Sequence, residues 1–124
     1  MDVFQIAQRA TDLDRAAAFY EALLGTPPTG RFDPPGLLFF QIGNTRLLLE
    51  ENASSSLLYL RVDDIDATVT RLREMDVAIE SEPHQIFTHT DDQLGPTGTT
   101  EWQAFFRDSE GNLVGLIGLA STAV

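Results

Sequence analysis

The sequence contains no cysteine and no lysine, and none of its apolar runs is long enough to span a membrane. Without cysteine the chain cannot form disulfides, thiolate zinc sites or a cysteine nucleophile. A membrane-spanning helix needs about 18 or more consecutive apolar residues, so none is predicted. Asp2, with no basic stretch behind it, does not begin a signal peptide. We therefore expect a cytoplasmic protein with no membrane partner.

Positive charge is scarce as well. Eight arginines face 19 aspartates and glutamates, which gives a net charge of −11. Such a charge argues against nucleic acid and anionic membranes as partners. It favours cationic ligands, although solubility is the simpler reason for it. The length of 124 residues and the 43% hydrophobic content predict one folded domain, residues 1–124, with a single sizeable core.

Alternation and helical spacing of apolar residues predict the elements along the chain. Caps at Asp12 and Asp64 begin two amphipathic helices, and Gly25 ends the first. The turn Asp108-Ser109-Glu110-Gly111-Asn112 joins two apolar runs, with Asp108 accepting from backbone N–H groups and Gly111 in the left-handed conformation. Strands are predicted over residues 3–9, 37–42, 46–50, 57–62, 77–79, 85–87, 102–107 and 112–119, with a short one near 30–33.

The first part of this pattern repeats 52 residues later. Gln5 corresponds to Leu57, Asp12 to Asp64 and Tyr20 to Leu72, and each half closes with a hairpin whose turn contains Gly-Asn. Module one covers about residues 3–51, a polar linker 52–56, and module two about 57–119. The prediction is an α+β fold of two βαβββ modules that form a cupped mixed sheet around a cavity, with the helices on the outer face.

Three motifs in this order resemble a known superfamily. Asp12-Leu13-Asp14-Arg15 with Phe19-Tyr20 is similar to the first-module signature of the vicinal oxygen chelate superfamily, which includes glyoxalase I, extradiol dioxygenases and bleomycin-resistance proteins. Val62-Asp63-Asp64-Ile65-Asp66-Ala67 resembles its second-module signature, and Phe105-Phe106-Arg107-Asp108 with Gly111-Asn112 its closing motif. The resemblance implies the fold and a homodimer, and is poor evidence for any one reaction.

The resemblance also implies where a divalent metal would bind. The four ligand positions correspond here to Gln5, to Leu48 or Glu50, to Leu57 and to Gly115. Leucine and glycine side chains cannot ligate a metal, and Gln5 with Glu50 would hold a cation loosely. We therefore predict no metal site and no cofactor.

Other residues are candidates for chemistry or binding. Glu50, on the cavity face of an apolar strand, is the candidate general base, unless it lies hydrated at the strand end. His84 is a candidate ligand contact near the cavity rim, although a hydrogen-bonded structural role is the alternative. Gln5 can orient an apolar ligand. Aromatic residues on the cavity face would stack on a flat or cationic ligand, or else pack in the core: Phe40, Tyr59, Trp102 and Phe106.

Three hypotheses follow. The first is a metal-independent protein of the bleomycin-resistance type that sequesters an aromatic or cationic small molecule in the concave pocket. The second is a glyoxalase-like lyase or isomerase with an atypical or metal-free site, in which Glu50 acts as base while Gln5 and His84 polarise a carbonyl. The third is a structural or partner-binding module whose cavity is filled by its own side chains.

Overall fold

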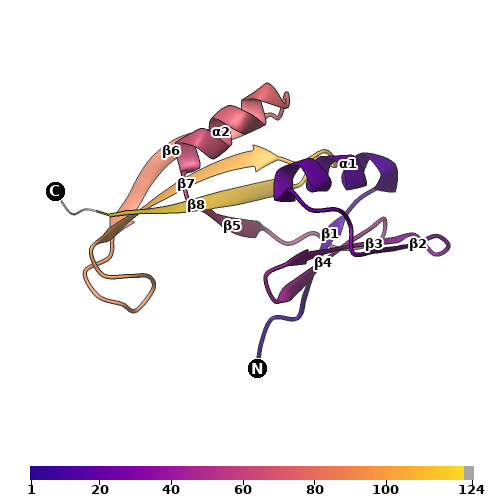
Figure 1. The fold of residues 1–124 in the computed structure, drawn as a ribbon, viewed down its shortest axis with the longest axis horizontal. Coiled ribbons are helices and arrows are strands. Elements are labelled where there is room, and N and C mark those ends of the chain that lie inside the picture. Colours follow the sequence, from indigo (N-terminus) through magenta and orange to yellow (C-terminus); the bar gives the residue numbers. More distant parts are fainter. Residues whose placement is uncertain (122–124) are drawn as a thin grey trace. The chain divides into compact units, whose positions relative to one another are not determined.

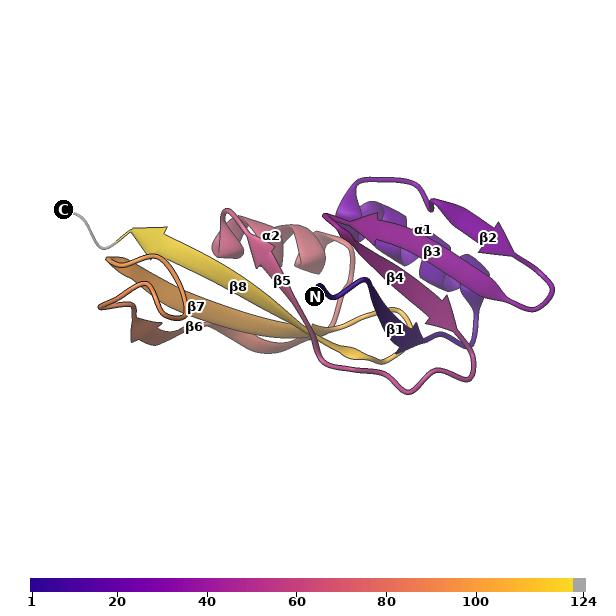
Figure 2. The same ribbon diagram turned by 90° about the horizontal axis from the view of Figure 1, so that it is seen from below.

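The structure, a computed structural model, describes residues 1–121, in which eight strands form two four-stranded sheets (Figure 1). The first sheet has the order β1-β4-β3-β2, with β1 parallel to β4 and the other pairs antiparallel (Figure 2). Its strands are β1 (Gln5–Arg9), β2 (Gly30–Phe32), β3 (Leu37–Ile42) and β4 (Thr45–Glu50).

The second sheet repeats this arrangement in the order β5-β8-β7-β6, again with one parallel pair, β5 with β8. Its strands are β5 (Leu58–Val62), β6 (Ile79–Thr88), β7 (Thr99–Arg107) and β8 (Leu113–Ser121). The predicted α+β fold of two βαβββ modules is confirmed, with one sheet for each module instead of one continuous ladder. Residues 77–79 and 85–87, predicted as two short strands, fall in or beside the single irregular strand β6.

Both helices begin at the predicted aspartate caps. The Asp12 side chain accepts from the Arg15 amide at the start of α1 (Leu13–Leu24), and Asp64 accepts from the Ala67 amide at the start of α2 (Ile65–Glu74). Gly25 ends α1 at a φ of 73°, a left-handed conformation that glycine adopts without strain. Within residues 1–121, neither helix combines the length and apolar character that crossing a bilayer requires.

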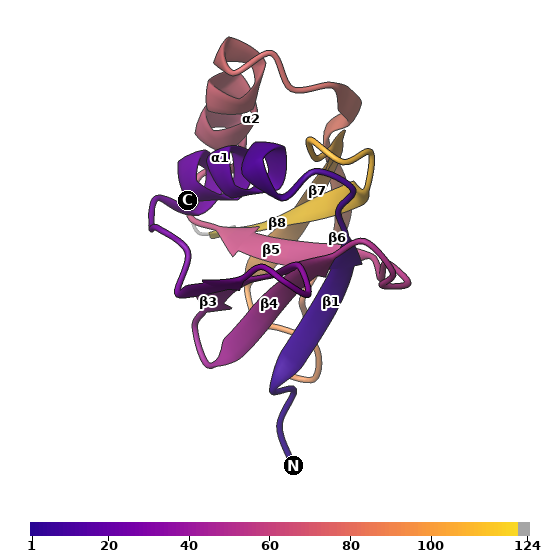
Figure 3. The same ribbon diagram turned by 90° about the vertical axis from the view of Figure 1, so that its right-hand side faces the viewer.

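Each helix covers one face of the sheet of its own module (Figures 1 and 3). Beneath α1, the side chains of Leu38, Phe40, Leu47 and Leu49 are almost completely buried, and the Tyr20 ring packs 6.0 Å from the Phe40 ring. The other face of each sheet carries fewer buried side chains, and we call it the open face. These open faces hold most of the candidate site residues.

The chain divides into two compact units, each built around one sheet. The first contains residues 1–56 and, unexpectedly, residues 108–112, the turn between β7 and β8. In that turn the buried Asp108 carboxylate accepts from the Glu110 amide (2.9 Å), the Asn112 amide (2.8 Å), the Asn112 side chain (2.9 Å) and the Tyr20 hydroxyl (2.6 Å). Burial first, and then the neighbouring Asp108 carboxylate, raise the pKa of Tyr20 far above its ordinary value, so the hydroxyl stays protonated and donates.

The same turn also contacts the start of α1, through the side chain of Glu110. Its carboxylate accepts from the amides of Thr11 (3.0 Å) and Asp12 (3.1 Å) and from Nε of Arg15 (2.7 Å). Burial alone would raise the pKa of Glu110, but the hydrogen bonds from Arg15, Asp12 and Ser109 outweigh it and lower the pKa from 4.5 to about 2. The negative charge also lies at the positive end of the helix dipole.

Glu110 therefore makes the stability depend on pH. The unfolded chain binds a proton at Glu110 near pH 4.5 and the folded chain near pH 2, so the stabilisation is complete above pH 4.5 and is lost as the pH falls through this window. We expect Glu110→Gln to lower the free energy of unfolding by about 1–3 kcal/mol at pH 7. Urea unfolding at pH 7 and pH 3.5 should give a smaller difference between wild type and variant at pH 3.5; an unchanged difference would contradict this account.

Candidate functional site

The open face of the first sheet carries Gln5 and Glu50, at opposite ends of the β1–β4 pair. Gln5 is opposite Arg46, and Glu50 is opposite Arg9, four residues further along β1. The Gln5 Oε1 atom accepts from Nε (3.1 Å) and Nη2 (2.6 Å) of Arg46. Glu50 is half-buried at the end of β4. The two predicted residues thus share a face without converging on one point.

The strand pairing settles which residue of β4 corresponds to Gly115. Leu48 is opposite Ala7 on β1, and Gly115 is opposite Tyr59 on β5. Ala7 and Tyr59 are themselves separated by the 52-residue repeat. Leu48, and not Glu50, is therefore the first-module counterpart of Gly115.

The open face of the second sheet carries a group of aromatic residues. Tyr59 on β5, Phe105 on β7 and His84 on β6 lie on this face, with Gly115 of β8 between Tyr59 and Phe105, and Tyr59 is 44% exposed. The Tyr59 and Phe105 rings meet edge to face with centroids 5.8 Å apart, and the His84 ring lies 6.4 Å from that of Phe105. We call Tyr59, His84, Phe105 and the adjoining Gln103 the aromatic face. Sequence reasoning identified Tyr59 and His84 but missed Gln103 and Phe105.

Gly115 lies directly under two of these rings. A Cβ atom added to Gly115 would be 2.7 Å from Cδ2 of Tyr59 and 3.1 Å from Cε1 of Phe105. The first distance is shorter than real side chains tolerate, so glycine is needed there for the rings to approach the backbone. Gly115 therefore marks a position where aromatic rings occupy the space of a side chain.

Polar groups beside the rings are held in defined orientations. Nδ1 of His84 lies 2.8 Å from the Glu82 backbone oxygen, which can only accept, so Nδ1 carries the hydrogen and Nε2 of the neutral ring is an acceptor. Nε2 of Gln103 donates to Glu101 (2.8 Å), whose other oxygen contacts Nε2 of the buried His89 (3.1 Å). The aromatic face therefore presents acceptors from His84 and from the Gln103 amide oxygen.

The remaining predicted aromatic residues lie on the helix-covered faces. Phe40 and Phe106 are at most 1% exposed and pack in the cores of their units. Trp102 is opposite Gly118, and Phe105 is opposite Gly115. Because Trp102 and Phe105 are three residues apart on β7, their side chains lie on opposite faces of the sheet. Partly exposed, Trp102 lines a pocket of about 390 Å³ together with three aspartates at the start of α2, Asp63, Asp64 and Asp66.

The four positions that the resemblance assigns to metal ligands do not fit a metal. Leu48 and Leu57 have no donor atom, and Gly115 has neither a side chain nor room for one. Gln5 has one amide oxygen, which already accepts from Arg46. Within residues 1–121, no three histidine, aspartate or glutamate side chains gather closely enough to hold a metal ion.

Comparison with solved structures supports the fold. The chain resembles TnmS3, an antibiotic binding protein from Streptomyces sp. CB03234, with a TM-score of 0.75, 25% identity and 97% of each chain covered. It also resembles a lactoylglutathione lyase from Agrobacterium tumefaciens, with a TM-score of 0.67, 23% identity, and 94% of this chain and 92% of the other covered. A glyoxalase/bleomycin resistance protein/dioxygenase from Alicyclobacillus acidocaldarius gives a TM-score of 0.67 at 19% identity, with 95% and 91% covered.

No curated protein matches the sequence. The sequence profile of one family does match, over residues 3–116, which include both modules and the closing hairpin as far as Leu116. The repeated βαβββ architecture and the aspartate-capped helices agree with that match. The chain belongs to the Glyoxalase/Bleomycin resistance protein/Dioxygenase superfamily.

Proposed function

We propose that the protein binds a flat aromatic small molecule on the aromatic face without a metal ion, and sequesters it without transforming it. One observation carries the proposal: Tyr59 and Phe105 close over Gly115, at the position where a metal-binding carboxylate is expected from the resemblance. A partly exposed pair of rings beside His84 provides a surface for stacking where the resemblance leads us to expect a reactive centre.

The chemistry of the face supports a ligand that carries hydrogen-bond donors. Stacking on Tyr59 and Phe105 contributes about 0.5–1.5 kcal/mol for each ring pair beyond the burial of apolar area. Nε2 of His84 and the amide oxygen of Gln103 accept hydrogen bonds and would orient N–H or O–H groups of the ligand. The net charge of −11 favours a cationic ligand over an anionic one at long range. A flat aromatic cation satisfies all three conditions.

Sequestration needs complementary shape and charge but no reactive group. The structural likeness to an antibiotic binding protein, over 97% of each chain, favours this role. The likeness to a lactoylglutathione lyase is consistent with the alternative, an enzyme, in which Glu50 would be the base. Against the enzyme, Gln5 and Glu50 lie at opposite ends of β1 and β4, and the Gln5 amide oxygen already accepts from Arg46. The homodimer remains a prediction, which sedimentation velocity can check.

Removing the Tyr59 ring tests the proposal. We expect Tyr59→Ala to weaken binding of 9-aminoacridine, a flat aromatic cation, about tenfold or more, because about 1.4 kcal/mol of stacking and burial is lost. Isothermal titration calorimetry measures the affinity, and the amide resonance of Gly115, which lies under the Tyr59 ring, should shift on binding to the wild type. The neutral 9-anthracenemethanol should bind more weakly than the cation.

Phe32→Ala is the matched control, because Phe32 is an exposed aromatic residue of the first sheet and is 55% exposed. It should leave 9-aminoacridine binding unchanged. Equal binding by wild type and Tyr59→Ala would reject the aromatic face as the site. Turnover of a hemithioacetal would reject sequestration in favour of an enzymatic function. Stoichiometric metal that a chelator removes together with activity would do the same. Failure of every aromatic probe to bind would favour the structural module.

A further inference from the structure

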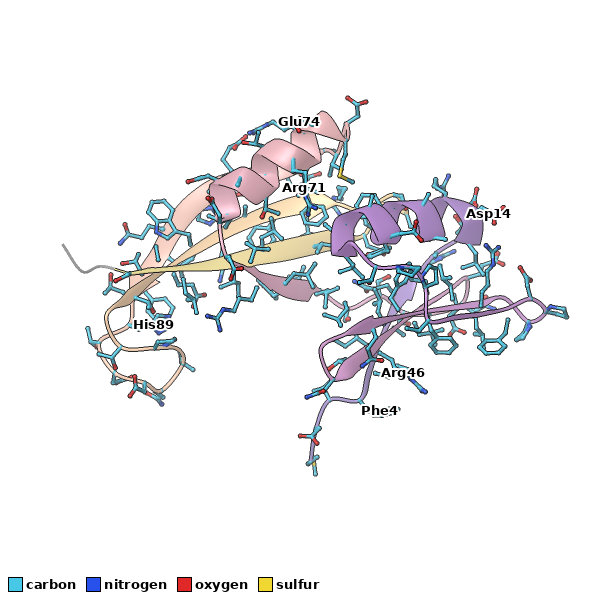
Figure 4. The ribbon with its side chains drawn as sticks, viewed as in Figure 1. Phe4, Asp14, Arg46, Arg71, Glu74 and His89 are labelled. Atoms are coloured by element: carbon cyan, nitrogen blue, oxygen red, sulfur yellow. The ribbon has the colours of Figure 1, made fainter. Side chains whose placement is uncertain are left out.

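A second feature, on the open face of the first sheet, shares no residue with the aromatic face. The Arg46 guanidinium lies between two phenyl rings, with its central carbon 4.6 Å from the centroid of Phe4 and 5.3 Å from that of Phe39. Figure 4 shows Arg46 and Phe4 together on the side of this sheet away from α1. Contacts of this kind between a cation and aromatic rings are favourable and restrict the orientation of the guanidinium plane.

Gln5 fixes the guanidinium further. Its Oε1 atom accepts from both Nε and Nη2 of Arg46, at 3.1 and 2.6 Å. A guanidinium has five N–H bonds, so this contact uses two of them, and the outer edge formed by Nη1 and Nη2 keeps the other three. On that edge, one N–H group of Nη1 and one of Nη2 can donate to the two oxygens of a single carboxylate.

Arg46 has no carboxylate partner within the described residues, although the chain holds 19 aspartates and glutamates. Four other arginines do form ion pairs with carboxylates: Arg15, Arg31, Arg73 and Arg107. Arg46 is therefore a half-buried cation that is held rigidly by neutral groups and has its charge uncompensated. A guanidinium suits a bidentate pair with a carboxylate, so Arg46 is able to receive its anion from a ligand.

A pocket adjoins this arginine. Its volume is about 310 Å³, and it is lined by Thr29, Gly30, Phe32, Phe39 and Arg46. The Phe32 and Phe39 rings meet edge to face with centroids 6.0 Å apart. A Cβ atom at Gly30 would lie 3.3 Å from the Phe32 ring, so glycine keeps this ring close to the backbone. The pocket thus combines two apolar rings with one cation, at the size of a small ligand.

We propose that this pocket is a second binding site, for a small aromatic carboxylate. The carboxylate pairs with the outer edge of Arg46, and the ligand's ring packs against Phe32 and Phe39. The site lies in the first unit and uses none of the residues of the aromatic face, so it stands or falls independently of the proposed function.

The probe that tests the site is 2-naphthoate, and the neutral 2-naphthalenemethanol is its uncharged counterpart. Titration calorimetry in about 0.15 M NaCl is appropriate, because repulsion from the acidic surface is screened beyond about 8 Å while a pair in contact is screened much less. We expect measurable binding of 2-naphthoate, at least tenfold weaker binding of the alcohol, and a shift of the Gly30 amide resonance without a shift at Gly115.

Two variants test whether binding depends on the positive charge of Arg46 and not only on an intact fold. Arg46→Gln should weaken 2-naphthoate binding at least tenfold. Gln5→Glu keeps the size of the side chain and supplies an internal carboxylate that neutralises the Arg46 charge, so it should weaken 2-naphthoate binding while the protein stays folded. The matched control is Arg61→Gln, which removes an exposed arginine that also forms no ion pair within the described residues, and it should bind 2-naphthoate as the wild type does.

Three results would overturn the proposal: no binding of 2-naphthoate to the wild type, equal affinity for Gln5→Glu, or equal affinity for the alcohol. Phe32→Ala should weaken 2-naphthoate binding but not 9-aminoacridine binding, and Tyr59→Ala should do the reverse. Loss of both ligands in one of these variants, with the fold intact by circular dichroism, would show that the two sites are not separate.

Discussion

Replacing Asp108 with alanine is expected to lower the free energy of unfolding by about 3–5 kcal/mol. The substitution removes the acceptor of four hydrogen bonds, from Tyr20, from two backbone amides of the turn and from the Asn112 side chain. A buried donor left without its partner costs about 1–3 kcal/mol, and the Tyr20 hydroxyl is such a donor. Urea unfolding followed by circular dichroism at pH 7 measures the change.

Tyr20→Phe is the matched variant. It removes only the hydroxyl and leaves Asp108 with three donors, so it should cost about 1.5–3 kcal/mol, less than Asp108→Ala. The two changes share one hydrogen bond, and their effects in the double variant should therefore add to less than the sum. An Asp108→Ala protein as stable as the wild type would show that the turn is not anchored through this carboxylate.

The second large effect is expected at Gly115. Gly115→Glu should lower the free energy of unfolding by about 3 kcal/mol or more, since it forces atoms into a filled space and buries a carboxylate against aromatic rings. It should also abolish 9-aminoacridine binding, because the Tyr59 ring must leave its place. We expect no metal uptake in return, since Leu48 and Leu57 still lack donors.

Gly115→Ala measures the cost of overpacking alone, because alanine adds a methyl group but no charge. In a strand, alanine normally gains about 0.5–1 kcal/mol over glycine, whereas overpacking costs about 1–3 kcal/mol. A Cβ at 2.7 Å from the Tyr59 ring makes overpacking the larger effect. In a Tyr59→Ala background the nearest clashing atoms are gone, and the cost of Gly115→Ala should shrink or change sign. A cost that is the same in both backgrounds would rule out the Tyr59 ring as its cause.

Much of the fold could be predicted from local chemistry and from the repeat. Asp12 and Asp64 stand 52 residues apart, and each accepts from the amide three residues ahead at the start of a helix. Gly111 has a φ of 82° in the closing turn, as its place after Asp-Ser-Glu predicts. Such signals depend on neighbours in sequence, and for that reason they can be read without the tertiary structure.

The sequence did not show which aromatic residues lie on the open faces of the two sheets. We expected Phe106 and Phe40 on the open faces, but Phe105 is opposite Gly115 and Phe39 is opposite Leu48. A shift of one residue along a strand moves a side chain to the other face of the sheet. The turns at residues 43–44 and 108–112 set these registers, and counting outward from them would have placed Phe39 and Phe105 correctly.

Other features had no local signal. The Tyr20–Asp108 hydrogen bond joins residues 88 positions apart, and Tyr20 in the sequence is only one more apolar position of a helix. The contacts of Arg46 with Phe4 and Phe39 depend on how β4 pairs with β1 on one side and with β3 on the other. Interactions of this kind follow from the packing of whole elements, which the periodicity of a single strand does not specify.

The membership of residues 108–112 in the first unit has a consequence for biosynthesis. Residues 1–56 leave the ribosome before this turn has been made, so the nascent segment lacks the acceptor of the Tyr20 hydroxyl and the Glu110 carboxylate that accepts from the Thr11 and Asp12 amides. Residues 1–56 therefore lack some of the side chains that hold their own unit together. The hydrogen bonds of the first unit are complete only after residues 108–112 have been synthesised.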